Sequence, residues 1–444
     1  MTTMTEPLHL IGVASLTAAI AAKEITPSEL LEAYLERIDE LDGRLKAWSQ
    51  IDREGIRAEA AAMTAEAARG ELRGPLHGIP FGVKEQFAVG GVPTLEDWLA
   101  ETHDIPAEDA VPVARLKAAG ALLVGKQYMV GPPGPPPSRN PWNLEHTPGG
   151  TSSGTGAAVG AYMAPFSLSE QTYGSGIRPA AYCGVTGFKP TFGRVARTGM
   201  FTMAWSLDHV CVIAYTAADI VPVFAALAGR HESDPVSFEA PAPAGTLDPS
   251  LVRPPRLGIV RNFFPERTQP VMNAAIDSSA EKLRAAGAEV VDILLPDEFE
   301  LAWAAHGIIG SVDGATLHAR GQAEKLAKGE AITGMGGRRV GALVPAPYYL
   351  QSQRLKGHLL AQVGSLFGQV DALVMATAPT GAPKGMPTGD TTLLRPWSYL
   401  GNPALSIPCG FDEFGLPLGL QMVGPTLGDE QLLAVVPTNV AHRK

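Results

Sequence analysis

The sequence is poor in cysteine and in positive charge. Its 444 residues include three cysteines, and 35 Lys and Arg face 45 Asp and Glu, for a net charge of −10 at pH 7. An odd number of widely spaced cysteines indicates a reducing compartment and gives no disulfide framework. The acidic balance, without any basic run, argues against a nucleic-acid partner. We therefore expect a cytoplasmic protein.

Signals for metals and membranes are missing as well. The sequence has no CxxC or HExxH motif and no clustered His, Asp and Glu at ligand spacing, so we expect no metal and no cofactor. The N-terminal apolar stretch, residues 10–22, is interrupted by Gly12 and ends at Lys23. It is too short to span a membrane and lacks the basic flank of a signal peptide, so we expect no membrane partner.

What the sequence does contain is enough apolar material for a large core, 45% of its residues. Residues 27–70 read as helical, because Pro27-Ser28-Glu29 is a helix-start signal and Gly70 a helix end. Residues 78–83, GIPFGV, read as a buried strand. Residues 114–126 read as a helix, a glycine cap at Gly120 and a strand.

The later sequence alternates in the same way. We expect a helix in AAVGAYMA after Gly156, an irregular GPPGPPP segment at 131–137, and a Pro/Ala-rich surface linker at about 236–255. Residues 257–260, 273–287 and 288–295 then read as strand, helix and strand. This alternation predicts an α/β protein with helices on both faces of a sheet.

The segment with the strongest chemical signal is residues 146–190, where a Gly/Ser/Thr-rich loop leads into a helix and Ser175 follows between glycines. A phosphate loop would need a lysine that this loop lacks. Residues 150–154 fit the G-x-S-x-G elbow with Ser152 as nucleophile, but the preceding NPWNLEHTP is polar and unlike a strand. A flexible linker is the plain alternative, which the following helical pattern disfavours.

Lys84 ends the apolar run of GIPFGVK, and this position allows two interpretations. The side chain snorkels from the strand end to water, or it is buried, where the charged ammonium is disfavoured and the free amine can act as a base. Position alone favours snorkelling.

Taken together, these motifs resemble the amidase signature family, serine hydrolases with a Ser–cis-Ser–Lys triad. The GGTSSG loop, Ser175 at 24 residues after Thr151, and the IRPAAYCG that follows match the family pattern. GIPFGVKEQF matches its lysine motif, and residues 395–425 match its C-terminal sheet region. The resemblance runs from about residue 10 to about 435. It implies one amidase signature domain over 1–444, with a mixed central sheet covered by helices and a signature core at about 75–195.

The resemblance also implies the roles of individual residues. Ser175 would be the nucleophile, Thr151 the intermediate hydroxyl and Lys84 the base of the triad. The backbone N–H groups of Thr172, Tyr173, Gly174 and Ser175 would form the oxyanion hole. The pocket for the acyl group would involve Met129, Gly131, Pro132 and Tyr173.

Several positions depart from the family pattern. Threonine stands at 151 where serine is usual, and its extra methyl restricts χ1. Tyrosine stands at 173 in place of glycine or alanine, where a positive φ would strain it. Gln171 and Ile177 replace the commoner aspartate and arginine together, which can be nearly neutral when both partners of a buried ion pair are lost. Arg178 is expected to be structural.

We therefore predict an amidase that acts on a small amide or carbamate as a monomer or homodimer. The apolar 131–137 loop, Tyr173 and Trp98 suggest an apolar or aryl substrate. Three alternatives remain open. One is carbamate hydrolysis (a urethanase) as the main activity. The second is a glutamine amidotransferase subunit, and the third is a catalytically degenerate binding protein.

Overall fold

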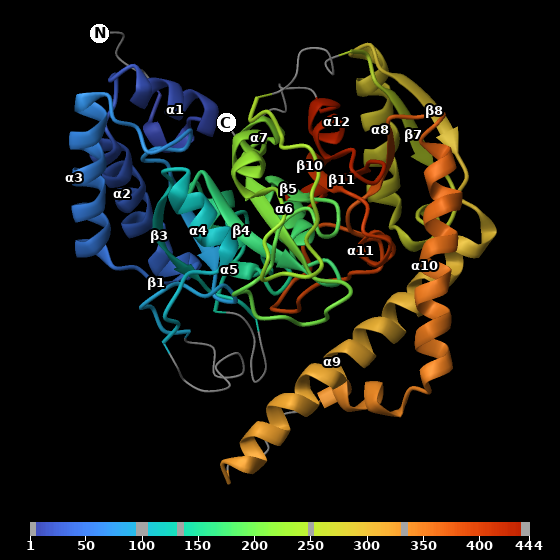
Figure 1. The fold of residues 1–444 in the computed structure, drawn as a ribbon. Coiled ribbons are helices and arrows are strands. Elements are labelled where there is room, and N and C mark those ends of the chain that lie inside the picture. Colours follow the sequence, from blue (N-terminus) through green and yellow to red (C-terminus); the bar gives the residue numbers. More distant parts are fainter. Residues whose placement is uncertain (1–5, 95–104, 131–136, 247–252, 330–335, 437–444) are drawn as a thin grey trace.

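The computed structural model describes residues 6–94, 105–130, 137–246, 253–329 and 336–436. Its centre is a sheet of eleven strands in the order β1-β3-β2-β4-β6-β5-β10-β11-β9-β7-β8 (Figure 1). The strands are β1 (Trp48–Gln50), β2 (Pro80–Lys84), β3 (Leu122–Gln127), β4 (Phe166–Gln171), β5 (Thr186–Lys189), β6 (His209–Ala214), β7 (Arg256–Val260), β8 (Glu289–Ile293), β9 (Ala372–Ala376), β10 (Ala404–Phe411) and β11 (Pro417–Val423).

The sheet is mixed. β2 runs parallel to both β3 and β4, and β7 runs parallel to both β8 and β9. The central strands β4, β6, β5, β10 and β11 pair antiparallel. The parallel pairs need crossovers, which helices provide on this chain, whereas the antiparallel pairs do not.

Helices surround this sheet (Figure 1). They are α1 (Val13–Ala21), α2 (Pro27–Leu45), α3 (Arg53–Arg69), α4 (Val111–Ala118), α5 (Ser153–Gly160), α6 (Ile177–Cys183), α7 (Ala217–Leu227), α8 (Pro270–Ala285), α9 (Leu301–Ala327), α10 (Ala346–Leu366), α11 (Arg395–Leu400) and α12 (Asp429–Ala434), with short 3₁₀ turns at Leu8–Leu10, Pro265–Arg267, Asp297–Glu300 and Gly336–Leu343.

Both faces of the sheet are covered. Leu122 and Leu123 are neighbours on β3 and therefore point to opposite faces. Leu122 joins a core with residues of α2, α3 and α5, whereas Leu123 packs against the larger core that includes α1, α4 and α7. This arrangement confirms the predicted α/β architecture with a mixed sheet between helices.

Most of the expected elements form where the sequence placed them. Thr26 and Glu29 make a reciprocal capping box at the start of α2. Gly70 ends α3 at a φ of 80°, and Gly120 lies between α4 and β3 at 88°. The segments around 257–295 form β7, α8 and β8 as expected.

Two expectations on helices were wrong in their bounds. The 27–70 region is not continuous helix, because Trp48–Gln50 pairs with β3 between two helices. The helix near Gly156 is α5, which already begins at Ser153 and ends at Gly160 rather than continuing through 164. Residues 238–246 of the expected linker form neither helix nor strand, and 131–136 lie outside the described residues.

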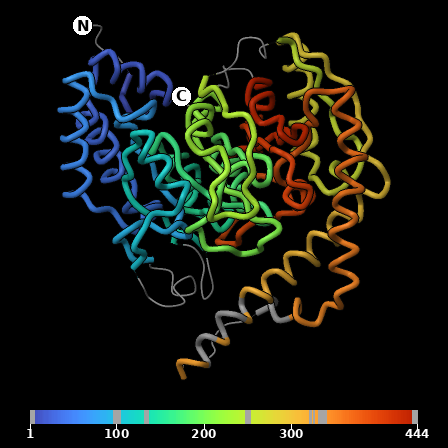
Figure 2. Tube along the Cα trace, viewed as in Figure 1, coloured from blue at the N-terminus to red at the C-terminus, as the bar shows by residue number. Residues whose placement is uncertain are grey.

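The helices α9 and α10 form a long pair that extends away from the sheet (Figure 2). α9 packs against α11, and its residue His306 is hydrogen-bonded to the Thr172 carbonyl in the loop that follows β4. α9 therefore contributes side chains to the region around Ser175. None of the described helices is both long and apolar enough to cross a membrane.

Candidate active site

Lys84 lies at the carboxyl end of β2, between the parallel strands β3 and β4. Its side chain is 0% exposed. The Nζ atom is 2.7 Å from Thr151 Oγ1 and 3.0 Å from Glu170 Oε2. The snorkelling alternative is therefore wrong, since the amine reaches buried partners rather than water.

Thr151 sits in the loop before α5. Gly149 and Gly150 have φ angles of 87° and 66°, the left-handed region that glycine adopts without strain. The Thr151 carbonyl accepts a hydrogen bond from Val130 N at 3.0 Å, just beyond β3. These features fix the loop so that the Thr151 hydroxyl faces Lys84.

Ser175 lies in the turn between β4 and α6. The side chain of Gln171, the last residue of β4, closes this turn by accepting hydrogen bonds from the N–H groups of Gly176 and Ile177 at 3.2 and 3.0 Å. Its amide nitrogen donates to Ser398 Oγ at 3.0 Å. A neutral glutamine thus satisfies the turn, and the apolar Ile177 is buried beside it.

The Ser175 hydroxyl has no hydrogen-bond partner among the described residues, and the residue is 7% exposed. In particular, it makes no hydrogen bond to Thr151. The two loops nevertheless touch, because a Cβ built on Gly150 would lie 3.1 Å from the Ser175 carbonyl oxygen. Catalytic hydrogen bonds are often long before substrate binds and tighten afterwards.

The backbone after β4 leaves donors available. In the described chain, the N–H groups of Gly174 and Ser175 donate to no protein acceptor. The Thr172 carbonyl is held by His306 Nε2 at 3.1 Å. Because a carbonyl only accepts, His306 carries its proton on Nε2, and burial lowers its pKa to about 3, so the ring is neutral.

Tyr173 is not among the residues with positive φ, so its backbone is free of the strain considered above. Its ring packs edge-on against His306, with centroids 4.5 Å apart, and the Arg395 guanidinium lies 5.4 Å from the ring centroid. A Cβ added at Gly310 of α9 would collide with the Tyr173 hydroxyl. The ring is therefore packed between α9 and α11 at the border of the site.

Three buried groups next to Lys84 share hydrogen bonds. Thr172 Oγ1 lies 2.6 Å from Glu170 Oε1 and 2.7 Å from Asp208 Oδ1. The second Asp208 oxygen accepts from the backbone N–H groups of Met203 and Ala204 at 2.6 and 3.0 Å. Burial and the nearby Glu170 raise the pKa of Asp208 to about 7.

Two other predicted residues have structural positions. Ser152 is fully buried as the N-cap residue of α5, and the described segment before it contains no strand, which removes the geometric basis for the elbow. Arg178 is buried and donates to the Gly389 carbonyl, so it ties α6 to the segment before α11. Its expected structural role agrees with this contact.

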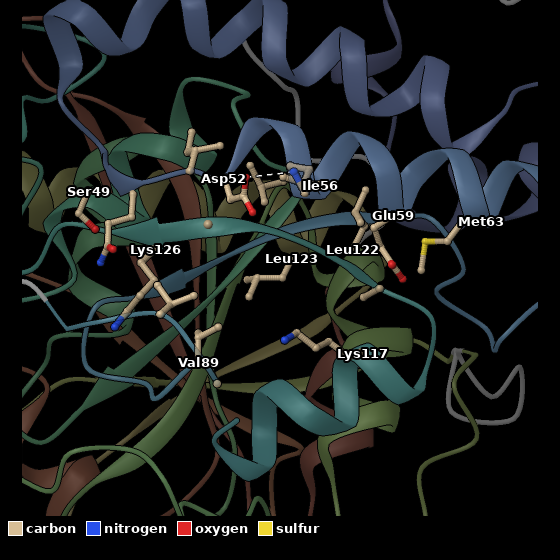
Figure 3. Close-up of a pocket in the computed structure, with 18 of the residues that line it drawn as sticks. Ser49, Asp52, Ile56, Glu59, Met63, Val89, Lys117, Leu122, Leu123 and Lys126 are labelled. Carbon is tan, nitrogen blue, oxygen red and sulfur yellow. Dashed lines mark hydrogen bonds between the residues drawn. The ribbon is translucent and has the colours of Figure 1, made fainter. Parts of the chain in front are cut away.

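The predicted pocket is only partly described. Met129 is buried, whereas Gly131, Pro132 and Trp98 lie outside the described residues. A cavity of about 820 Å³ lies elsewhere, between α3, β1 and β3, and is lined in part by Lys126 and Lys117 (Figure 3). No group of three or more His, Cys, Asp or Glu suited to a metal occurs in the described ranges.

Sequence reasoning missed Glu170, Asp208 and His306. Glu170 offered a signal, because a carboxylate stood five residues before Ser175 in an otherwise uncharged stretch. Asp208 and His306 come from a loop and from α9, far away in sequence. No local pattern links them to the site.

The comparisons with known proteins fit this geometry. The profile of the Amidase family matches residues 29–433. The chain is 36% identical to a glutamyl-tRNA(Gln) amidotransferase subunit from Roseiflexus castenholzii, over 97% of this chain and 95% of that one. It is 32% identical to the protein of the same name from Streptomyces coelicolor, over 95% and 94%.

Solved structures agree at similar identity. The peptide amidase of Stenotrophomonas maltophilia superimposes with a TM-score of 0.80 at 30% identity, over 96% of this chain and 95% of that one. A structure described as a vestigial protein complex that reveals the origins of an s-triazine catabolic enzyme gives 0.84 at 30% identity, over 96% and 97%.

Proposed function

The chain belongs to the Amidase family, and on that premise we propose that it hydrolyses the C–N bond of a small amide or carbamate through an acyl-enzyme on Ser175. Family membership makes it an amide-hydrolysing enzyme of the serine-hydrolase type. The observation that carries the assignment of residues is the fully buried Lys84, whose Nζ lies 2.7 Å from Thr151 Oγ1 beside the Ser175 turn.

In the proposed mechanism, Ser175 Oγ attacks the acyl carbon and passes its proton to Thr151, which passes its own proton to the free amine of Lys84. The bond to the leaving nitrogen then breaks as a proton returns along the same hydroxyl. Water then attacks the acyl-enzyme and passes a proton through Thr151 to Lys84. The acid leaves as a proton returns through Thr151 to Ser175 Oγ. A carbamate would form a carbamoyl-enzyme on the same residues.

The proposed oxyanion hole consists of the N–H groups of residues 172–175. Support comes from the Gly174 and Ser175 N–H groups, which have no protein acceptor in the described chain. Donors held in place before the reaction stabilise the negative charge where it develops. His306 supports this backbone through its hydrogen bond to the Thr172 carbonyl.

A substrate panel tests the proposal. Purified protein would be incubated with primary amides, anilides, aryl carbamates and glutamine, and released amine or ammonia would be measured. We expect turnover of at least one non-glutamine member, with preference for apolar or aryl groups near Tyr173 and Met129, as a monomer or homodimer. Ser175→Ala should abolish it. Activity that persists in Ser175→Ala would contradict the assignment.

A second candidate function is release of ammonia from glutamine within an amidotransferase complex. It is favoured by the name of the curated relatives, which match 95% or more of this chain. It predicts that glutamine is the preferred member of the panel and that added partner proteins raise the rate. Turnover of anilides without partners, and none of glutamine, would exclude it.

A further inference from the structure

A continuous chain of buried polar groups leads from Lys84 away from Thr151. It runs from Lys84 Nζ to Glu170 Oε2 at 3.0 Å, from Glu170 Oε1 to Thr172 Oγ1 at 2.6 Å, and from Thr172 Oγ1 to Asp208 Oδ1 at 2.7 Å. Glu170 is 1% exposed and Asp208 is 1% exposed. The mechanism above uses none of the side chains of Glu170, Thr172 and Asp208.

The Thr172 hydroxyl limits how this chain can be protonated. A hydroxyl has one proton to donate, yet its oxygen lies within hydrogen-bond distance of two carboxyl oxygens. If both carboxyls were ionised, one of the contacts would bring two unprotonated oxygens together in a buried site, at a high energetic cost. At least one of Glu170 and Asp208 therefore holds a proton.

We propose that Thr172 couples the two carboxyls so that ionisation of Asp208 moves a proton from Lys84 to Glu170 and leaves Lys84 as the free amine. Glu170 is then a positioning residue that acts through Lys84. The inference rests on the proposed function, because it explains how Lys84 becomes a base beside a carboxylate at 3.0 Å.

Two states with balanced protons describe the switch. In the resting state Asp208 is protonated and donates to Thr172, Thr172 donates to the Glu170 carboxylate, and Lys84 is an ammonium. When Asp208 loses its proton to solvent, Thr172 turns to donate to it. Glu170 then donates to Thr172 through Oε1–H, using the proton that Lys84 gives up.

In this second state the hydrogen bonds suit a base. Glu170 Oε2 accepts an N–H from Lys84, so the amine's lone pair is free for the Thr151 proton. The Asp208 carboxylate keeps three donors, namely Thr172 and the N–H groups of Met203 and Ala204. Carboxylates with several such donors are stabilised in the charged form.

The charged and titratable groups around this chain come from several elements. They are Lys84 on β2, Glu170 on β4, Lys189 on β5, Arg197 and Asp208 before β6, His209 and Cys211 on β6, His306 on α9, Lys356 on α10 and Arg395 on α11. Burial lowers the pKa of both histidines and raises that of the Cys211 thiol, which keeps all three neutral near pH 7.

Two lysines in this set also titrate near neutrality. Burial lowers the pKa of Lys189 to about 7 and that of Lys356 to about 8. Lys189 Nζ donates to the Asn402 carbonyl, and Lys356 Nζ lies over the Phe192 ring. Neither amine is hydrogen-bonded to Glu170, Thr172 or Asp208.

The switch predicts that acylation speeds up as the pH rises through the ionisation of the Asp208–Glu170 pair. Because the pKa of Asp208 is raised to about 7, the rise falls near neutral pH. If Lys84 acted independently of the two carboxyls, replacing Glu170 and Asp208 by their amides would not shift the pH midpoint of acylation in opposite directions.

The test compares Glu170→Gln with Asp208→Asn, two isosteric substitutions with opposite expected effects. A glutamine mimics protonated Glu170 and removes the charge that holds the ammonium, so the midpoint should move down by about 1–3 pH units. An asparagine mimics protonated Asp208 and holds Thr172 toward Glu170. The rate at pH 8 should then fall at least about tenfold, as expected when the midpoint rises by one unit.

The readout is the rate at which a fluorophosphonate labels Ser175, measured from pH 5 to 10 on folded protein. Opposite shifts support the switch, whereas shifts in one direction, or equal losses at every pH, overturn it. Thr172→Val should remove the effect of Asp208→Asn, and Thr172→Ser should keep the wild-type midpoint. If Asp208→Asn does not fold, Thr172→Val and Thr172→Ser decide the matter: the midpoint should move in Thr172→Val, which breaks the link between the carboxyls, and stay in Thr172→Ser, which keeps it.

Two controls separate this inference from its premise. Lys189→Met should leave the midpoint in place, and a midpoint that moves with Lys189 would overturn the role of the carboxyl pair. Wild-type protein that is not labelled on Ser175 at any pH, or whose labelling is unaffected by Lys84→Met, contradicts the proposed function itself. Labelling that depends on Lys84 but not on Glu170 or Asp208 contradicts only the switch.

Discussion

Two buried lysine–glutamate pairs lie next to each other at the ends of β2 and β3, and they differ in how their carboxylates are satisfied. Lys126 on β3 pairs with Glu85 at 3.2 Å, and Lys84 on β2 pairs with Glu170 at 3.0 Å. All four side chains are essentially inaccessible to solvent. Burial and charge alone therefore do not distinguish a structural pair from a functional one.

The Lys126–Glu85 pair has unambiguous donors. Glu85 accepts from Ser49 Oγ and Gln50 Nε2 as well as from Lys126, whose Nζ also donates to Thr94 Oγ1. Burial lowers the pKa of Lys126 and Glu85 opposes that shift. Each of these three partners of Glu85 is a donor, which is typical of an ion pair that joins strands.

In the Lys84–Glu170 pair, one hydroxyl donor, that of Thr172, lies within hydrogen-bond distance of two carboxyls. Glu170 shares the single proton of Thr172 with Asp208, and Lys84 has the Thr151 hydroxyl on its other side. In the proposed switch, two arrangements of protons satisfy these groups. The comparison teaches that the capacity for proton transfer lies in the neighbours of the pair and in the hydroxyl between two carboxyls.

The largest expected effect is a difference between Lys84 and Lys126 in the rate at which Ser175 is labelled. Lys84→Met should lower the rate of fluorophosphonate labelling of Ser175 by about 10²- to 10⁴-fold, the usual contribution of a general base. Lys126→Met, the matched control, should leave labelling close to wild type. Equal loss of labelling in both folded variants would contradict the distinction between a functional Lys84 and a structural Lys126.

The next largest effect concerns the stability of the folded protein when the Lys126–Glu85 pair is broken. Lys126→Met leaves Glu85 buried without its counter-charge and should lower the free energy of unfolding by about 3–5 kcal/mol. Denaturant titration followed by circular dichroism measures it. Substituting Glu85 and Lys126 together by Gln and Met should recover part of the loss. A negligible change in the single variant would show that this pair does not hold the strands.

A smaller effect appears in the pH dependence of stability. The folded state keeps a proton on Asp208 up to about pH 7, whereas an unfolded aspartate releases it near pH 4. This stabilising contribution is therefore complete below about pH 4 and is lost as the pH rises toward 7, at about 1.4 kcal/mol per pH unit at most.

Asp208→Asn should flatten that part of the profile. The free energy of unfolding of the variant minus that of wild type, measured at several pH values between 4 and 8, should increase as the pH rises. A difference that stays constant over this range would mean that Asp208 is ionised throughout, and the pair with Glu170 would need another proton donor.

The smallest effect concerns the hydroxyl beside Lys84. Thr151→Ser removes a methyl that restricts χ1 and should raise the single-turnover acylation rate, by less than about tenfold. Rapid-mixing measurements of the acylation phase would detect it. An unchanged rate would indicate that the threonine relays protons as well as serine does.

The fold could be predicted from the sequence because many of its helix ends and strands are determined by residues that are neighbours in the chain. The capping box at Thr26, the glycines at 70 and 120, and the apolar runs of β2 and β3 depend on neighbouring residues, and all formed as expected. The short strand β1 was missed because its pairing with β3 is decided by tertiary contact rather than by local propensity.

The proposed site could be inferred from the sequence only where its residues belong to one segment or one motif. Lys84, Thr151 and Ser175 followed from motif resemblance, and the contact between the first two fits that expectation. Asp208 and His306 reach the site through the pairing of β4 with β6 and the packing of α9. Such contacts over long sequence separations leave no periodic or spacing signal in a single sequence.

The most direct test of the central claim is the location of the covalent adduct. Wild-type protein would be treated with a fluorophosphonate, digested, and the labelled peptide sequenced by mass spectrometry. The account predicts a single adduct on Ser175 that Lys84→Met suppresses. An adduct on Ser152, or no serine adduct on active protein, would contradict it.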